Sequence, residues 1–401
     1  MEQTSILKLN NDCWLEIFSF LSLEEKTRLK FICKYFNELA DESYKTCRIF
    51  DCVKLRKNPK ITDEKLEEIA LKIGKYVDIL KISWGRNDDK KRILAIFECC
   101  PKLKHLYLNG DVTQIFVESQ DKDILRKMLT KLKSLQMRHT TLNDDIGILF
   151  RDAGHLESLD LVTSEINGSS FSHLKNLKVL NVDGSQINGS IAFEDFCQAN
   201  LTLEKLDVSY ADFFDQDCLN GVTRNLKNLH ELNIGRYLYE YRLDRVINLR
   251  NLTHLTIRCM RPNEWSWLEA LAEKKRLEYL SIIASSNERF LNALNKFQTL
   301  KILKIFSCIN LDDDFLANLP KPEILEELHI RGSKVSDDGA YDFITMKSSV
   351  LKYIDLTGCR NISDNFSCRI QKTVRKTPLT IQAKYTGIRN SFQSANLQIL
   401  I

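Results

Sequence analysis

A short apolar motif recurs along most of the chain and constrains its fold more than any other feature. The pattern apolar-x-x-apolar-x-apolar occurs eleven times, and a weaker copy, VDILKI, starts at Val77. The clear copies start at Leu103, Leu132, Leu156, Leu177, Leu203, Leu229, Leu252, Leu277, Leu300, Leu325 and Leu351. Successive copies lie 21 to 29 residues apart, with a mean near 25. Such a period predicts a stack of small units that bury a continuous core between neighbours.

The spacing inside each copy predicts a short strand. The second and third apolar residues, such as Leu159 and Leu161, are two apart and therefore face the same side of a strand. Because one unit cannot bury its own apolar face, neighbouring strands must stack into a parallel sheet. The pattern resembles the leucine-rich repeat, which implies an α/β solenoid with the sheet on the concave face and helices or irregular turns on the convex face. We expect about twelve repeats over residues 77–376.

The ninth position of each repeat supports the resemblance. In that family it usually holds Asn or Cys, whose side chain turns inward and bonds the loop backbone. Here the position holds mostly small or hydrogen-bonding residues: Asp111, Thr140, Ser164, Ser185, Ala211, Tyr237, Met260, Ser285, Cys308, Ser333 and Cys359. Because Tyr237 and Met260 depart from the pattern, we expect an irregular, partly bulged region at about 236–265. The last repeats resemble the cysteine-containing subtype, and their aspartates should be helix N-caps: Asp312, Asp337 and Asp364.

Residues 9–40 contain two apolar runs separated by a polar turn. Ser22 is expected to cap a helix, with Glu25 completing a capping box. Four apolar residues should then share one face of that helix: Leu29, Ile32, Cys33 and Phe36. The first run is apolar on more than one side, which is more surface than so small a segment can bury by itself. The remaining surface implies a partner, or docking onto the solenoid.

This segment resembles the F-box, which opens on Leu-Pro in its family and ends with a Val-Cys-Lys-x-Trp-like run. Here Leu9 stands at the leading leucine, Asn10 replaces the proline and Phe36 replaces the tryptophan. The resemblance implies binding to a Skp-type adaptor and, through it, to cullin and RING subunits. The residues expected to bind the adaptor are Leu9, Trp14, Leu15, Ile17, Phe18, Leu21, Leu29, Ile32, Cys33 and Phe36. The alternative is that these helices only cap the first repeat.

The remaining segments complete the expected domain plan. Residues 1–46 should form the F-box-like helical segment, 47–76 a linker or degenerate first repeat with a helix capped at Thr62 or Asp63, and 377–401 a C-terminal cap and tail. A helix is expected near residues 365–376. The run PLTIQAKYTG that follows should be an edge strand. The last residues, RNSFQSANLQILI, should be frayed, although their apolar end could dock.

Composition and missing motifs argue against several classes of protein. The 58 Lys and Arg residues nearly balance the 54 Asp and Glu residues, so charge does not predict nucleic-acid binding. No signal peptide or long apolar span is apparent, so we expect no membrane partner, a cytoplasmic or nuclear protein, and twelve reduced cysteines. No Cys-x-x-Cys, GxSxG, HExxH or P-loop pattern occurs. We therefore expect neither an enzyme nor a metal or other cofactor.

Exposed strand positions on the concave face are the expected binding site for a protein substrate. A central acidic or polar band contains Asp160, Asn181, Asp183, Asp207, Glu231 and Asn233. A more basic and aromatic part contains Arg258, Lys304, His329 and Arg331. We hypothesise that the acidic band attracts a basic element of the substrate, the alternative being an ordinary solvated surface. The resemblance implies a substrate receptor of an SCF-type ubiquitin ligase that leads to proteasomal degradation. The alternative is a repeat scaffold or inhibitor without a ubiquitin role.

Overall fold

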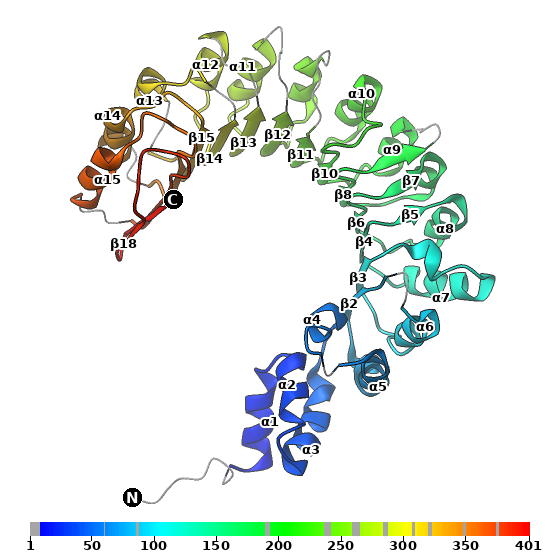
Figure 1. Cartoon of the computed structure of the whole chain (residues 1–401). Coiled ribbons are helices and arrows are strands. Elements are labelled where there is room, and N and C mark those ends of the chain that lie inside the picture. Colours follow the sequence, from blue (N-terminus) through cyan, green and yellow to red (C-terminus); the bar gives the residue numbers. More distant parts are fainter. Residues whose placement is uncertain are drawn as a thin grey trace, which may run out of the picture. The chain divides into compact units, whose positions relative to one another are not determined.

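A computed structural model describes most of the chain as two compact units, Met1–Asn200 and Leu201–Ile401. The described residues are 9–59, 61–85, 88–188, 193–235, 242–258, 265–283, 288–306, 309–319, 323–347, 350–373 and 377–401. Within each unit, parallel strands line one side and most helices line the other (Figure 1). We call the exposed side of these strands the strand face.

Three short helices open the first unit: α1 (Asn11–Ser19), α2 (Leu23–Leu29) and α3 (Lys34–Ser43). The side chain of Asn10 caps α1 by accepting the Cys13 N–H at 2.8 Å. Ser22 caps α2, and Glu25 accepts the Ser22 N–H at 2.7 Å, so the expected capping box is confirmed.

The expectation of one helix running from Ser22 to Phe36 is wrong. The helix α2 ends at Leu29, and Cys33 is extended, with φ −159° and ψ 167°, before α3 begins. This break folds α3 back, so that Leu39 packs in one cluster with Trp14 of α1. Because both helices present apolar residues to that cluster, the apolar spacing continues across the break and conceals it.

Residues after the helices supply the first strand of the sheet. Strand β1 (Ile49–Asp51) pairs in parallel with β2 (Ile79–Ser83). The helices between and after them are α4 (Cys52–Leu55), α5 (Asp63–Ile73) and α6 (Lys90–Glu98). Thr62 caps α5 as expected, since its hydroxyl accepts the Lys65 N–H at 3.3 Å.

The rest of the first unit repeats this arrangement. Its sheet continues through β3 (His105–Asn109), β4 (Ser134–Arg138), β6 (Ser158–Asp160) and β8 (Val179–Asn181). A smaller sheet contains β5 (Thr141–Leu142), β7 (Glu165–Asn167) and β9 (Gln186–Asn188). The helices include α7 (Ser119–Leu129), α8 (Asp144–Gly147) and α9 (Phe193–Ala199). Five in-register leucines are fully buried: Leu80, Leu106, Leu135, Leu159 and Leu180.

The second unit continues the same plan. Its parallel strands are β10 (Lys205–Asp207), β11 (Glu231–Ile234), β12 (His254–Arg258), β13 (Tyr279–Ile283), β14 (Ile302–Phe306), β15 (Glu327–Arg331), β16 (Tyr353–Asp355), β17 (Leu379–Gln382) and β19 (Leu397–Leu400). Its helices are α10 (Gln216–Asn225), α11 (Ser266–Glu273), α12 (Glu288–Leu294), α13 (Asp313–Asn318), α14 (Asp337–Asp342) and α15 (Asp364–Gln371). The expected helix after the repeats is therefore α15.

The C-terminal segment is more ordered than expected. Strand β17 is not an edge, because it lies between β16 and β19. The final residues are not frayed, because β19 pairs with β17 and also antiparallel with β18 (Phe392–Gln393). Their apolar alternation, in which Leu397 and Ile399 are buried, continues the core and closes the sheet.

The expected irregular region at 236–265 is only partly accessible, because 236–241 and 259–264 lie outside the described residues. Between them, β12 pairs in register with both β11 and β13. The described part, β12, is therefore regular, and the rest of the prediction concerns residues outside the described structure.

Ninth-position side chains join neighbouring repeats as expected. The Ser185 hydroxyl donates to the Leu161 carbonyl at 2.5 Å, and the Cys359 thiol donates to the Ile330 carbonyl at 3.3 Å. The expected residues Tyr237, Met260, Ser285 and Cys308 lie outside the described residues.

One of the three expected aspartate caps is confirmed. Asp312 caps α13, but Ser336 caps α14 and Ser363 caps α15. Asp337 and Asp364 stand one residue later and accept hydrogen bonds from the following repeat instead. Asp337 accepts the Ser363 N–H at 2.7 Å and its hydroxyl at 2.5 Å. A serine followed by an aspartate offers two good cap residues, and the sequence does not show which of them turns toward its neighbour.

Candidate functional site

The F-box-like helices combine a small core with exposed apolar residues. Trp14 and Phe18 are buried with Leu39, and the Trp14 ring meets the Phe36 ring edge-on at 4.9 Å. Four predicted adaptor residues pack partly buried against this core: Leu15, Leu21, Leu29 and Phe36. Trp14 and Phe18 therefore hold the helices together, and direct contact with an adaptor is a prediction for the more exposed residues.

Four predicted residues of this module are exposed, on α1 or in the segments that flank the helices: Leu9, Ile17, Ile32 and Cys33. The structure adds two that the prediction omitted, Phe20, which is 81% exposed, and Phe31, which is 59% exposed. Both were detectable, because Phe20 lies three residues after Ile17 and Phe31 precedes Ile32. Several large apolar side chains on so small a module mark a candidate protein-binding surface.

Ion pairs connect this module to the first repeat. Asp41 lies 2.6 Å from the Lys30 Nζ and 3.4 Å from that of Lys72 on α5. Burial alone would raise the pKa of Asp41, but the two lysines outweigh burial and lower it. Within the module, the buried Lys26 places its Nζ 3.4 Å from the Thr46 hydroxyl.

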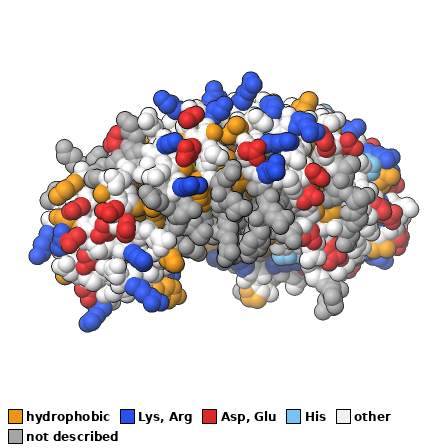
Figure 2. Space-filling model, turned by 90° about the horizontal axis from the view of Figure 1, so that it is seen from above, with side chains coloured by type: hydrophobic (Ala, Val, Ile, Leu, Met, Phe, Trp, Pro, Cys, Tyr) orange, Lys and Arg blue, Asp and Glu red, His pale blue; other side chains and the backbone are white. Residues whose placement is uncertain are grey.

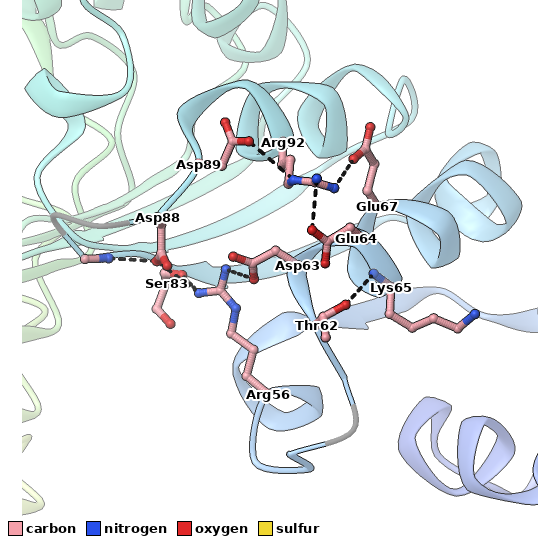
Figure 3. Close-up of polar contacts among 11 residues, drawn as sticks. Arg56, Thr62, Asp63, Glu64, Lys65, Glu67, Ser83, Asp88, Asp89 and Arg92 are labelled. Atoms are coloured by element: carbon pink, nitrogen blue, oxygen red, sulfur yellow. Dashed lines mark hydrogen bonds and ion pairs between the residues drawn. The ribbon is translucent and has the colours of Figure 1, made fainter.

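A second network fixes α4 to the repeats that follow it (Figure 3). The Arg56 guanidinium donates to the Ser83 carbonyl at 2.5 Å and pairs with Asp63 at 2.8 Å and Asp88 at 3.3 Å. Nearby, Arg92 of α6 pairs with Glu64, Glu67 and Asp89. These contacts join α4, α5, β2 and α6 into one framework.

Three of the six residues of the predicted acidic band, Asp160, Asn181 and Asp207, bond to the backbone where their strands end. In β6, the Asp160 carboxylate accepts the N–H two residues later, from Val162, at 3.2 Å. In the same way, Asn181 accepts the Asp183 N–H at 3.0 Å, Asp207 accepts the Ser209 N–H at 2.9 Å and Asp355 accepts the Thr357 N–H at 3.0 Å. Each of these strands ends at its Asp or Asn after three residues, whereas β2, β3 and β4, with Lys81, Tyr107 and Gln136 at that position, have five. Asp and Asn favour such local turns because their side chains imitate a backbone acceptor.

Two other predicted members of the band, Glu231 and Asn233, are paired through their side chains. In the second unit, Glu231 lies 3.1 Å from the Lys205 Nζ, and the Asn233 amide donates to Asp207 at 2.9 Å. Asp160 and Asn181 are register neighbours in the first unit. These contacts do not test the proposed attraction of a basic substrate element, but they reduce the charge available for it.

Three predicted basic residues gather on β14 and β15 of the second unit. Lys304 pairs in register with His329, and Arg331 stacks on the Phe306 ring at 5.6 Å. Arg258 lies on β12, and its side chain is outside the described structure.

Sequence reasoning missed the residue that organises this group, Asp355 of β16. Its fully buried carboxylate accepts the Arg331 Nε–H at 2.6 Å and lies 3.5 Å from the His329 Nδ1. Burial alone would raise the pKa of Asp355, but the contacts with His329, Thr357 and Arg331 hold it well below its usual range. The sequence contained one signal for Asp355: it occupies the same position in its repeat as Asp160 and Asp207 do in theirs.

The described residues also bear on two other classes of site, a metal site and a membrane-spanning helix. Within them, no three His, Cys, Asp or Glu side chains gather closely enough to hold a metal ion. None of the described helices has the length and apolar character needed to cross a bilayer. On the face shown in Figure 2, charged side chains of both signs are interspersed.

Comparisons with known proteins agree with this architecture. Residues 6–48 match the family model described as F-box domain. A Caenorhabditis elegans protein named putative RNA-binding protein EEED8.10 is 24% identical over 386 residues, which are 90% of this chain and 51% of that protein. This chain thus spans about half the length of that curated relative.

A solved structure supports the fold. A chain from the crystal structure of the Rad7 and Elc1 complex in yeast has a TM-score of 0.54 and 17% identity, covering 93% of this chain and 96% of that chain. An internalin from Listeria monocytogenes has a TM-score of 0.47 and 17% identity, covering 81% of this chain and 84% of that chain. The chain therefore joins an F-box domain at residues 6–48 to a solenoid of the leucine-rich-repeat fold, with a ladder of buried leucines and parallel strands.

Proposed function

We propose that this chain is the non-catalytic substrate-recognition subunit of an SCF-type ubiquitin ligase, acting in the cytoplasm or nucleus. Its F-box would bind a Skp-type adaptor and, through it, cullin and RING subunits. Its repeats would hold a protein substrate for ubiquitination and proteasomal degradation. The observation that carries the proposal is the F-box domain at residues 6–48, whose surface exposes large apolar side chains.

The connection between the F-box and the repeats supports this function. A receptor must hold its substrate in a defined position relative to the adaptor, which requires a stiff connection between the two binding regions. The ion pairs of Asp41 with Lys30 and Lys72, together with those of Arg56 across α4, supply stiffness within the first unit.

Co-purification with a Skp-type adaptor tests the proposal. The full chain should form a stable complex, and each single change Phe20→Asp, Phe31→Asp or Ile32→Asp should be tested for its effect on adaptor affinity. We expect at least one of them to weaken affinity tenfold or more, because burying a charge at an apolar interface is strongly unfavourable. Leu71→Asp is the matched control, since Leu71 is 68% exposed but lies outside the F-box on α5.

The results separate this function from its rival. Failure of the intact chain to bind any adaptor would favour a repeat scaffold or inhibitor without a ubiquitin role. Binding that survives all three F-box changes would show that the adaptor contacts another surface. Far-UV circular dichroism of each variant establishes that its fold is retained.

A further inference from the structure

A cavity of about 480 Å³ opens on the strand face of the first unit. The chain at Ile82 and Leu108, on β2 and β3, lies along it, although both side chains are buried on the opposite side of the sheet. Val53 of α4 is the lining residue with an exposed aliphatic side chain. One wall is α4, which lies on the strand-face side of the sheet whereas α5 and α6 lie on the other (Figure 1). The cavity therefore forms where a short helix passes in front of the first strands of the solenoid.

Positive charge surrounds this cavity. The cavity has one carboxylate in its lining, that of Asp51. Four cationic side chains also line it: Lys54, Lys57, Lys81 and Arg138. They come from α4, the turn after it, β2 and β4. No other basic residue lies among the cavity's lining residues. Like charges gathered around one hollow repel one another, so the arrangement favours an anionic occupant.

The cations are only loosely neutralised by the protein itself. Lys54 lies 3.9 Å from Glu24, Lys81 lies 3.9 Å from Asp51, and Arg138 lies 3.9 Å from Asp160. All three distances are near the outer limit for an ion pair, and these side chains are roughly half exposed. Lys57 is exposed and forms no ion pair among the residues that the structure describes. A ligand anion would therefore meet available donors without first breaking close pairs.

The wall that carries two of these lysines is held in place. Arg56 stands between Lys54 and Lys57 in the sequence, and its guanidinium bonds to Ser83 and pairs with Asp63 and Asp88 (Figure 3). The α4 wall is thus fixed before any ligand arrives, which reduces the entropy lost on binding.

We propose that this cavity binds an anionic segment of a protein substrate, in which an acidic or phosphorylated side chain lies next to an apolar one. The cationic rim would hold the charged group, and the exposed Val53 side chain on α4 would contact the apolar one. This inference rests on the proposed receptor function and names the substrate chemistry that the first repeats would select.

Three features favour a peptide over a nucleic acid. The ring of Tyr107 is covered by the Lys81 ammonium at 5.1 Å, so that face is not open to a stacking base. Beyond Arg138 the strand face carries Asp160 on β6, whose charge would repel a continuing phosphate backbone. The cavity volume also suits a few side chains rather than an extended strand.

Fluorescence anisotropy with the full chain tests the inference. The probes are labelled peptide pools with degenerate flanks around a fixed centre of leucine beside phosphoserine, aspartate or serine, and a labelled single-stranded RNA of ten nucleotides. We expect at least one anionic pool to bind ten times more tightly than the serine pool, and more weakly as salt is raised. Binding of the phosphoserine pool alone identifies phosphorylation as the source of the charge, and binding of both anionic pools shows that acidity suffices.

Charge reversal locates the binding. Lys57→Glu combined with Lys81→Glu should weaken binding of the anionic pool at least tenfold. Lys102→Glu, which changes an exposed lysine outside the cavity by the same charge, should alter it less than twofold. Unchanged binding by the double variant, or equal binding of the serine pool, overturns the inference.

Two further outcomes keep this inference separate from the proposed function. If the RNA binds more tightly than every peptide pool and the double variant loses it, the site takes nucleic acid and the peptide inference fails. The double variant should still bind the Skp-type adaptor. Adaptor binding without selective peptide binding therefore overturns this inference alone, whereas loss of adaptor binding by the intact chain overturns the receptor function.

Discussion

Two substitutions at Asp355 distinguish the contribution of its turn hydrogen bond to stability from that of its buried charge. In Asp355→Asn, an amide oxygen can still accept the Thr357 N–H, as Asn181 does for the equivalent turn of β8. What this variant loses is the charge that pairs with Arg331 at 2.6 Å. In Asp355→Ala, both the ion pair and the turn bond are removed.

The structure sets the expected magnitudes. Charge-assisted hydrogen bonds contribute about 1.5–3 kcal/mol, but Arg331 is half exposed and regains water, so Asp355→Asn should lower the free energy of unfolding by about 1–2 kcal/mol. Leaving the Thr357 N–H unpaired and the carboxylate's space empty adds about 1–2 kcal/mol in Asp355→Ala. The control Asp160→Asn should cost less than about 1 kcal/mol, because its nearest guanidinium lies at 3.9 Å.

Urea unfolding followed by circular dichroism measures these differences. With a slope of about 3 kcal/mol per molar urea, Asp355→Ala should lower the midpoint by roughly 1 M. If the Asn and Ala variants are equally unstable, the turn bond contributes nothing. If neither differs from the unmodified chain, the buried carboxylate is not the organising residue inferred above.

The pH dependence gives an independent check. The folded-state pKa of Asp355 is depressed below its unfolded value of about 3.9, so its contribution is fully present above that pH and is lost as pH falls through the folded-state pKa. The stability difference between the unmodified chain and Asp355→Asn should therefore shrink as pH falls below about 4. A gap that stays constant from pH 7 to pH 3 would contradict the role assigned to the charge.

Two further predictions concern the joints between repeats. Gly358→Ala should lower the free energy of unfolding by about 1 kcal/mol, which a melting temperature lower by a few degrees would show. The cost is backbone strain, because φ at Gly358 is +74°. Steric overlap adds nothing, since the nearest atom to an added Cβ is 3.7 Å away. Asp337→Ala should destabilise by about 1–3 kcal/mol in urea, because the Ser363 N–H and hydroxyl lose their acceptor. Asp338→Ala, at a neighbouring exposed carboxylate, should change stability by less than about 0.5 kcal/mol, and equal effects of the two changes would rule out the inter-repeat role.

Features that repeat in the sequence were predictable. The buried leucine ladder follows from spacing alone, because every copy of the motif places the same residues on the same side of a strand. The Ser22 capping box was equally predictable, because its two residues lie three apart in the sequence and their side chains are suited to this bonding pattern.

Features that depend on folding back were not predictable in the same way. The break at Cys33 has no Gly or Pro to mark it, and only the packing of Leu39 on Trp14 requires it. The cavity of the first unit likewise joins Lys57 with Arg138, which lie 81 residues apart in the sequence and belong to different repeats. A one-dimensional pattern identifies the members of each repeat, but not which side chains from separate repeats share a hollow.

The Asp and Asn residues that end the short strands offer a simple route to new specificity. A strand that ends at such a residue exposes few side chains on the strand face, whereas a five-residue strand such as β4 also exposes Arg138 there. Replacing one such Asp with a residue that does not bond its own backbone would lengthen the strand, and the reverse exchange would shorten it. Neither exchange alters the buried leucines. Neighbouring repeats could thus acquire different binding footprints through single substitutions while the fold is inherited unchanged.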